Sequence, residues 1–136
     1  MAKVVNLKVG QSAKIMGEVK FKSTPESGII IGELVVIRGP VEIGAGTVIK
    51  DLAFIGPNTL IGEGCIIGPH AVIGDTTYRD VSTKFDPDDV YTEKKPVMTV
   101  LGDNVVIGAN TTVKEGAYLE RNTIILEGGT DIETKV

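Results

Sequence analysis

An aliphatic residue returns every six positions through the middle of this chain. Between residues 31 and 73 that residue is isoleucine each time, at Ile31, Ile37, Ile43, Ile49, Ile55, Ile61, Ile67 and Ile73. A glycine follows most of them. A period of six fits neither a helix, with its period of 3.6, nor the simple alternation of a β-hairpin. The stretch therefore predicts an internal repeat.

Each six-residue unit, or hexad, carries a second inward position four residues after the isoleucine. Small or β-branched residues fill it, at Val35, Val41, Thr47, Ala53, Thr59, Cys65 and Ala71. Side chains alternate along a strand, so the isoleucine and this residue point to the same face. Glycine after the isoleucine suits a tight bend. We therefore expect short strands that form coils, stacked by parallel pairing into an all-β parallel β-helix.

The pattern divides the chain into segments of one domain, residues 1–136. We expect irregular first coils over 9–28, regular coils over 29–74, an extruded loop over 75–99 and final coils over 100–130. The turn-forming segment 23–28 shifts the phase by four and is expected to protrude. After the long loop, the aliphatic positions resume at Leu101, Ile107, Val113, Leu119 and Ile125.

The segment 75–99 has no hexad pattern. It holds Tyr78, Phe85 and Tyr91, together with acidic and basic clusters. Loops of this length inside a compact domain are usually functional. The alternative is a loop that only packs against its own or a neighbouring β-helix.

Composition restricts the partners and the compartment. The net charge of −4 argues against nucleic acid or an anionic membrane as the main partner. The single cysteine excludes an intrachain disulfide and favours a cytoplasmic location. Cys65 falls on an inward position, which predicts a buried packing residue. We find no signal-peptide pattern and no apolar run long enough to span a membrane.

The repeat resembles the hexapeptide-repeat proteins, which fold as left-handed parallel β-helices with three hexads per triangular coil. The resemblance covers roughly residues 9–130, and its left-handedness is implied by the family, since general crossover rules favour the right hand. Most enzymes of this family are acyltransferases. The segment IGPHAVIGD, the extruded loop and then GDNVVIGANTTV are most similar to cytosolic acetyltransferases that N-acetylate amino sugars on nucleotide carriers.

The resemblance implies a homotrimer with its active site in the cleft between neighbouring β-helices. The acyl donor would be acetyl-CoA and the acceptor a small molecule, with no metal involved. The pantetheine arm would meet backbone amides at Gly108 and Ala109, with Asn110 beside it. Lys114 and Arg121 are candidates for contacts with the CoA phosphates.

The chemistry requires a neutral amine, a base to remove its proton, and donors to stabilise the developing oxyanion. His70 is the only histidine, and an imidazole suits proton transfer near neutral pH. It precedes the inward Ala71, so we expect it to point outward as the catalytic base. The alternative is a solvated surface histidine. Asp75, Tyr78 and Arg79, at the mouth of the loop, are the candidate substrate-binding residues.

Two other functions are alternatives to acyl transfer. A non-catalytic trimeric β-helix, acting as a scaffold or binding module, is favoured by the short C-terminal end and the single histidine. A β-helical carbonic anhydrase is disfavoured, because those enzymes bind zinc with three histidines at each subunit interface. The outward apolar residues predict a lateral wall for trimerisation: they are Val36, Val48, Phe54, Leu60, Ile66, Val72 and Val106.

Overall fold

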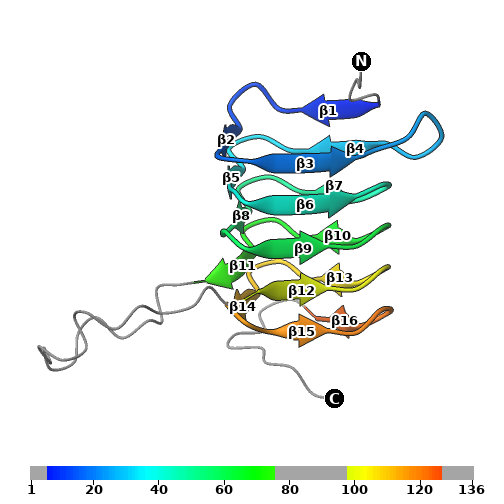
Figure 1. Cartoon of the computed structure of the whole chain (residues 1–136). Helices are drawn as coiled ribbons and strands as arrows, with labels where there is room; N and C mark the ends of the chain where they lie inside the picture. The colour runs from blue at the N-terminus through cyan, green and yellow to red at the C-terminus, as the bar shows by residue number, and fades with distance from the viewer. Residues whose placement is uncertain (1–5, 76–97, 127–136) are drawn as a thin grey trace, which may run out of the picture.

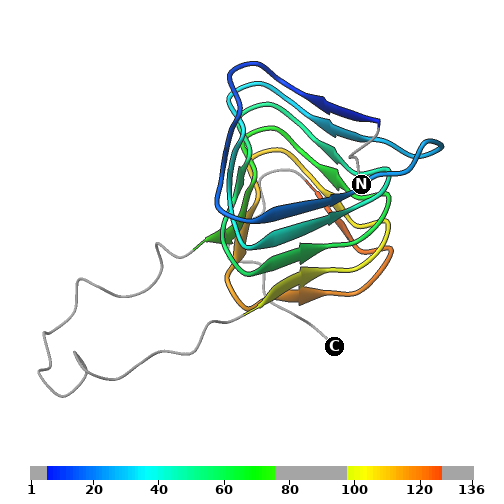
Figure 2. The same cartoon turned by 45° about the horizontal axis from the view of Figure 1, so that its top comes forward.

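The computed structural model describes residues 6–75 and 98–126, and these form a stack of triangular coils (Figures 1 and 2). The strands are β1 (Leu7–Val9), β2 (Lys14–Met16), β3 (Val19–Lys22), β4 (Ile29–Ile31), β5 (Val36–Arg38), β6 (Val41–Gly44), β7 (Val48–Ile49), β8 (Phe54–Ile55), β9 (Thr59–Ile61), β10 (Ile66–Ile67), β11 (Val72–Asp75), β12 (Thr99–Leu101), β13 (Val106–Ile107), β14 (Thr112–Lys114), β15 (Tyr118–Leu119) and β16 (Ile124–Ile125). No helix among the described residues is long and apolar enough to cross a membrane.

The strands form three parallel sheets, in which every neighbour lies three strands away along the chain. Sheet A has the order β1-β4-β7-β10-β13-β16, sheet B the order β14-β11-β8-β5-β2, and sheet C the order β15-β12-β9-β6-β3. One strand from each sheet makes one coil, as Figure 2 shows along the stack. This all-β solenoid confirms the predicted fold class, a left-handed parallel β-helix.

The hexad isoleucines form the core by stacking in register. In sheet A, Ile31 pairs with Ile49, Ile49 with Ile67, and Ile67 with Ile107. All four are at most 2% exposed, so each side chain packs on its equivalents in the adjacent coils. Burying an aliphatic side chain contributes about 1.5–3 kcal/mol, which explains how a chain with few aromatic residues holds this fold.

The second inward positions are buried too, including the polar ones. Thr47, Thr59, Thr99 and Thr111 are fully buried. The Thr47 hydroxyl donates to the Gly62 carbonyl at 2.8 Å, and the Thr59 hydroxyl donates to the Gly56 carbonyl at 2.8 Å. Threonine therefore fits these positions because its hydroxyl satisfies a backbone group at the bend.

The first coil is more regular than the sequence predicted for residues 9–28. Strands β1, β2 and β3 pair in register with β4, β5 and β6. After β3 the chain makes the protruding loop seen in Figure 1, closed by two backbone hydrogen bonds between Thr24 and Ser27. The weaker hexads of this segment thus still form a coil, because pairing with the strong hexads of the next coil sets their register.

The outward apolar residues do not form one wall. Successive hexads place them on successive faces, so Val48 lies on sheet A, Phe54 on sheet B and Leu60 on sheet C. The most apolar face is that of sheet A, where the central outward positions pair in register: they are Ile30, Val48, Ile66, Val106 and Ile124. The predicted lateral wall is therefore wrong, because a period of three hexads decides which outward residues share a face.

Candidate functional site

His70 lies on a tight turn between β10 of sheet A and β11 of sheet B, at what we call the A–B corner. The turn spans 68–71 and is closed by the Ala71 amide, which donates to the Gly68 carbonyl at 3.3 Å. Pro69 takes the second position and His70 the third, with a φ of 62°. Proline second and a left-handed residue third is the arrangement of a type II turn. The His70 side chain is exposed, as its hexad position predicted.

The same corner repeats in adjacent coils. Leu34, Leu52 and Asn110 take the position of His70 and also have positive φ, of 58°, 68° and 60°. The His70 amide donates to the Asp51 carbonyl at 3.1 Å, and the Asn110 amide donates to the Pro69 carbonyl at 3.0 Å. Hydrogen bonds between coils thus fix the position of the His70 backbone along the axis of the β-helix.

The structure brings His70 together with the predicted residues Gly108, Ala109 and Asn110. A Cβ added to Gly68 would lie 2.7 Å from the Gly108 carbonyl carbon and 2.8 Å from the Ala109 nitrogen. The His70 turn therefore rests directly on the 108–109 peptide, and only glycine at 68 permits this approach.

One of the two amides predicted to meet the pantetheine arm is already engaged. The Gly108 amide donates to the Ile125 carbonyl at 2.8 Å, and the amide of the neighbouring Asn110 donates to Pro69. Within the described part of the chain, the Ala109 amide makes no hydrogen bond. A ligand lying along this corner would therefore meet one backbone donor that has no partner among the described residues.

The remaining predicted residues lie elsewhere. Asp75 and Lys114 pair through their backbones at the far end of sheet B, across an irregularity that follows Ile73. Asp75 lies five positions after His70, mostly along β11, which corresponds to at most about 16 Å at 3.3 Å per residue. Tyr78 and Arg79 lie outside the described residues. Arg121 follows β15 at the corner between sheets C and A, away from His70.

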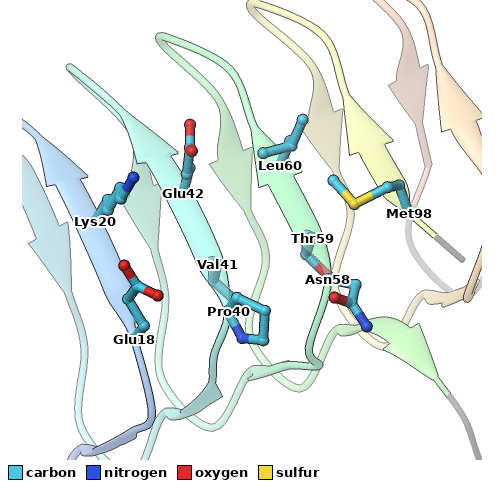
Figure 3. A pocket seen from close by; sticks show the side chains of 9 residues that line it. All are labelled: Glu18, Lys20, Pro40, Val41, Glu42, Asn58, Thr59, Leu60 and Met98. Carbon is cyan, nitrogen blue, oxygen red and sulfur yellow. The ribbon is translucent and has the colours of Figure 1, made fainter. Parts of the chain in front are cut away.

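A groove lies on sheet C beside the B–C corner, where the chain leaves at Asp75 and returns at Met98 (Figure 3). Its volume is about 150 Å³. Figure 3 shows carboxylates and an amine on the side of β3 and β6, and the apolar Leu60 and Met98 on the other. The lining includes Glu18, Lys20, Glu42, Asn58, Leu60 and Met98. Sequence reasoning missed these residues, because they come from successive coils and share no motif.

A second hollow, of about 300 Å³, lies on sheet A next to the A–B corner. Its lining includes Ile30, Gly32, Val48, Lys50, Asp51 and Pro69. Pro69 belongs to the His70 turn, so this hollow adjoins the candidate base. The two hollows lie on different faces of the molecule, and one copy of the chain does not join them into a single site.

Other titratable groups serve the structure. The Lys22 ammonium, 3.0 Å from a Glu42 carboxylate oxygen, lowers the pKa of Glu42, and hydrogen bonds from Ser12 lower the pKa of Glu33. Burial raises the pKa of the Cys65 thiol, which donates to the Gly102 carbonyl at 3.1 Å. Cys65 is therefore a packing residue, as predicted. Over residues 6–75 and 98–126, no cluster of three His, Cys, Asp or Glu side chains could hold a metal ion.

Comparison with known proteins supports the resemblance found in the sequence. Residues 40–75 match the family described as bacterial transferase hexapeptide (six repeats). The match is confined to these residues, and it confirms the predicted resemblance to hexapeptide-repeat proteins. No curated protein matches the sequence.

Solved structures share the fold. A histidine-to-alanine variant of GDP-perosamine N-acetyltransferase from Caulobacter crescentus, in complex with CoA and GDP-perosamine, aligns with a TM-score of 0.71 at 18% identity. A histidine-to-asparagine variant of perosamine N-acetyltransferase from the same organism, with the same ligands, aligns with a TM-score of 0.62 at 17% identity. Each alignment covers 94% of this chain and 49% of the other, so this chain spans about half the length of these structures.

Proposed function

We propose that this protein is an acyltransferase that moves an acetyl group from the thioester of CoA to the amine of a small acceptor, such as a nucleotide-linked amino sugar. The observation that carries the proposal is the placement of the exposed His70 turn directly over the Gly108–Ala109 peptide. The match to transferase hexapeptides and the CoA complexes of the similar structures support the same class.

His70 acts as the base in this proposal. The acceptor nitrogen forms a bond to the thioester carbonyl carbon, and the carbon–sulfur bond breaks. The imidazole takes the proton lost by the nitrogen and returns it to the departing thiolate, so atoms and charges balance. An exposed imidazole suits this exchange because histidine is the side chain that most often transfers protons in such reactions.

The Ala109 amide is the donor for the developing oxyanion. It lies in the turn beneath His70, and the amides of Gly108 and Asn110 serve the coil instead. A backbone donor aimed at the developing charge contributes in the transition state without needing to reorganise. The exposed Asn110 side chain stands one coil from His70 and is available to orient the donor.

A homotrimer completes the site. His70 and Ala109 lie at the A–B corner, whereas Asp75, Lys114 and the groove lie at the B–C corner. In a threefold arrangement with the C–A corner nearest the axis, sheet A of one copy faces sheet C of the next. The two hollows then open into one cleft, with the candidate base on one side and the groove beside Asp75 of the next copy on the other.

Exposed aliphatic side chains support sheet A as an interface. Ile30 is 46% exposed and Ile66 is 39% exposed, although both lie at the centre of the face. On sheet C, Leu60 and Val100 occupy the corresponding central positions. Contact between these faces near the axis would remove both apolar ladders from water. The cytoplasmic location expected from the single cysteine stays a prediction.

The same exposed ladder also favours a second function, a trimeric scaffold without catalysis. Engagement of the Gly108 and Asn110 amides in the coil favours it too, because it leaves little backbone to bind a pantetheine arm. The two functions share the oligomer and differ in whether acetyl-CoA binds.

The test is thermal melting of the purified trimer with and without millimolar acetyl-CoA. A ligand that binds only the native state at a hundredfold excess over its Kd adds about 2.7 kcal/mol of stability, which is easily visible. A clear shift supports the transferase and justifies assays with amino-sugar nucleotides. An intact trimer without a shift favours the scaffold, and a monomer by light scattering rules out the shared cleft.

A further inference from the structure

The N-terminal coil is an open end of the β-helix. Strands β1, β2 and β3 are the terminal strands of sheets A, B and C, and no described strand lies beyond them (Figure 2). Their inward side chains are only partly covered, with Val9 39% exposed and Ile15 36% exposed. One coil further on, the equivalent Ile31 and Ile37 are at most 2% exposed. Over the described residues, this end therefore leaves core positions partly exposed and its strand edges without a paired strand.

The longest strand at this end is β3, and it offers a regular edge. In a parallel ladder, alternate residues bond to the strand on either side. Because β3 has β6 on one side only, about half of its amide and carbonyl groups point toward the free edge. Unpaired groups of this kind are a template for the backbone of another strand.

The side chains of β3 indicate which kind of strand could pair with its edge. Val19 and Phe21 face the core, whereas Lys20 and Lys22 point outward. Lysines on an edge oppose pairing with a neutral or basic strand. When the neighbouring strand carries acidic side chains opposite these lysines, the charge pairs stabilise the two strands.

The existing partner of β3 shows this preference. In β6, Glu42 lies directly opposite Lys20, and its carboxylate is 3.0 Å from the Lys22 ammonium. The residues on either side, Val41 and Ile43, cover Val19 and Phe21 in the core. The neighbour that β3 already pairs with thus places one acidic residue, between two apolar ones, within reach of both lysines.

We propose that the free edge of β3 binds an extended acidic segment of another protein, which adds a strand to sheet C. Its apolar residues would cover Val19 and Phe21, and its acidic residues would face Lys20 and Lys22, repeating the contacts of β6. A second copy pairing β3 with β3 would instead place lysine opposite lysine. This inference does not depend on the proposed acyl transfer.

The experiment measures amide hydrogen exchange of the full chain with two blocked heptapeptides. The acidic probe is Gly-Val-Glu-Ile-Glu-Val-Gly, and the basic control is Gly-Val-Lys-Ile-Lys-Val-Gly. We expect the acidic peptide to slow exchange in β3 and to bind about fivefold more tightly than the basic one, as cross-strand charge pairs allow.

Variants of the two lysines make the test independent of peptide hydrophobicity. Lys20→Glu with Lys22→Glu should reverse the preference, and the corresponding glutamine pair should abolish it. Lys50→Glu, on sheet A, is the matched control and should leave it unchanged. The proposal fails if neither peptide protects β3, or if the reversed variant keeps the original preference. It fails equally if protection of β3 rises with protein concentration alone, because a second copy then occupies the edge.

Discussion

His70 and Asn110 occupy equivalent positions in successive coils, and both hold a left-handed backbone, with φ of 62° and 60°. The pairing of Ile67 with Ile107 and of Val72 with Thr112 fixes this equivalence. Among residues with a side chain, asparagine and histidine adopt this conformation most readily. The corner thus imposes a positive φ on whichever residue occupies it, including the leucines at 34 and 52, and His70 meets this requirement with less strain while presenting an imidazole to solvent.

This equivalence predicts that His70→Asn separates chemistry from folding. Asparagine keeps the left-handed turn, so the free energy of unfolding should change by less than about 0.5 kcal/mol. Loss of the base should lower kcat by about 10²- to 10⁴-fold. Urea unfolding and steady-state assays with acetyl-CoA measure the two effects.

His70→Ala provides the comparison. It removes the same base but places alanine at positive φ, which should cost about 1 kcal/mol of stability. A wild-type rate in either variant would show that His70 is a solvated surface residue, the alternative left open by the sequence.

Gly68→Ala should destabilise the protein through a backbone contact. The added Cβ would meet the Gly108 and Ala109 backbone at 2.7–2.8 Å, and neither group can rotate away. We expect a loss of about 2–3 kcal/mol in the free energy of unfolding. The control is Gly64→Ala, whose Cβ would meet the end of the Asn104 side chain and whose φ of 68° costs about 1 kcal/mol. Equal losses would contradict the role given to the close approach.

Leu52→Asn should raise stability. Leu52 has a φ of 68° at the same corner, and its side chain is 43% exposed. Asparagine relieves strain of about 1 kcal/mol while little buried area is lost. The melting temperature should rise by about 4 °C. Leu60→Asn, at a half-buried position without positive φ, is the matched control and should lower it. A fall for Leu52→Asn would show that its apolar contacts outweigh the strain.

The two perturbed carboxylates predict how stability depends on pH. In the native state the pKa of Glu33 and of Glu42 lies below the ordinary value of 4.5. The unfolded chain therefore binds more protons in the window just below pH 4.5. Their contribution is complete above that pH and is lost as the pH falls through the native pKa values. Urea midpoints between about pH 3 and pH 6 measure the loss.

The cause of each shift can be tested separately. Ser12→Ala removes the hydroxyl hydrogen bond to Glu33 and keeps the one from the backbone amide, so it should weaken the pH dependence at any ionic strength. Lys22→Gln should flatten it mainly at low salt, because salt screens the exposed ion pair with Glu42. If neither substitution changes the loss of stability at low pH, groups other than Glu33 and Glu42 cause that loss.

Much of the fold could be predicted from the period of six. The inward positions of Ile67 and Cys65, and the outward position of His70, follow from strand alternation within a hexad. The regular first coil was missed because its hexads are weak, and only pairing with β4, β5 and β6 sets their register.

The candidate site was harder to predict. Within one copy, Asp75 and Lys114 lie at the other end of sheet B from His70, so only a second copy could bring them to the same site. The sequence assigned the amides of Gly108 and Ala109 to a ligand, but the coil uses that of Gly108. The groove with Glu18, Glu42 and Met98 brings together residues from successive coils, and no spacing within one hexad contains that information.

The sequence by itself determined the core, because the buried positions recur at one period and need only local alternation to point inward. Tertiary structure decided which outward residues share a face or a corner. That depends on three hexads closing one coil and on an insertion between β11 and β12 that leaves the register intact. The inward direction of a core residue is a property of a single strand, whereas the grouping of outward residues on a face arises only when coils stack.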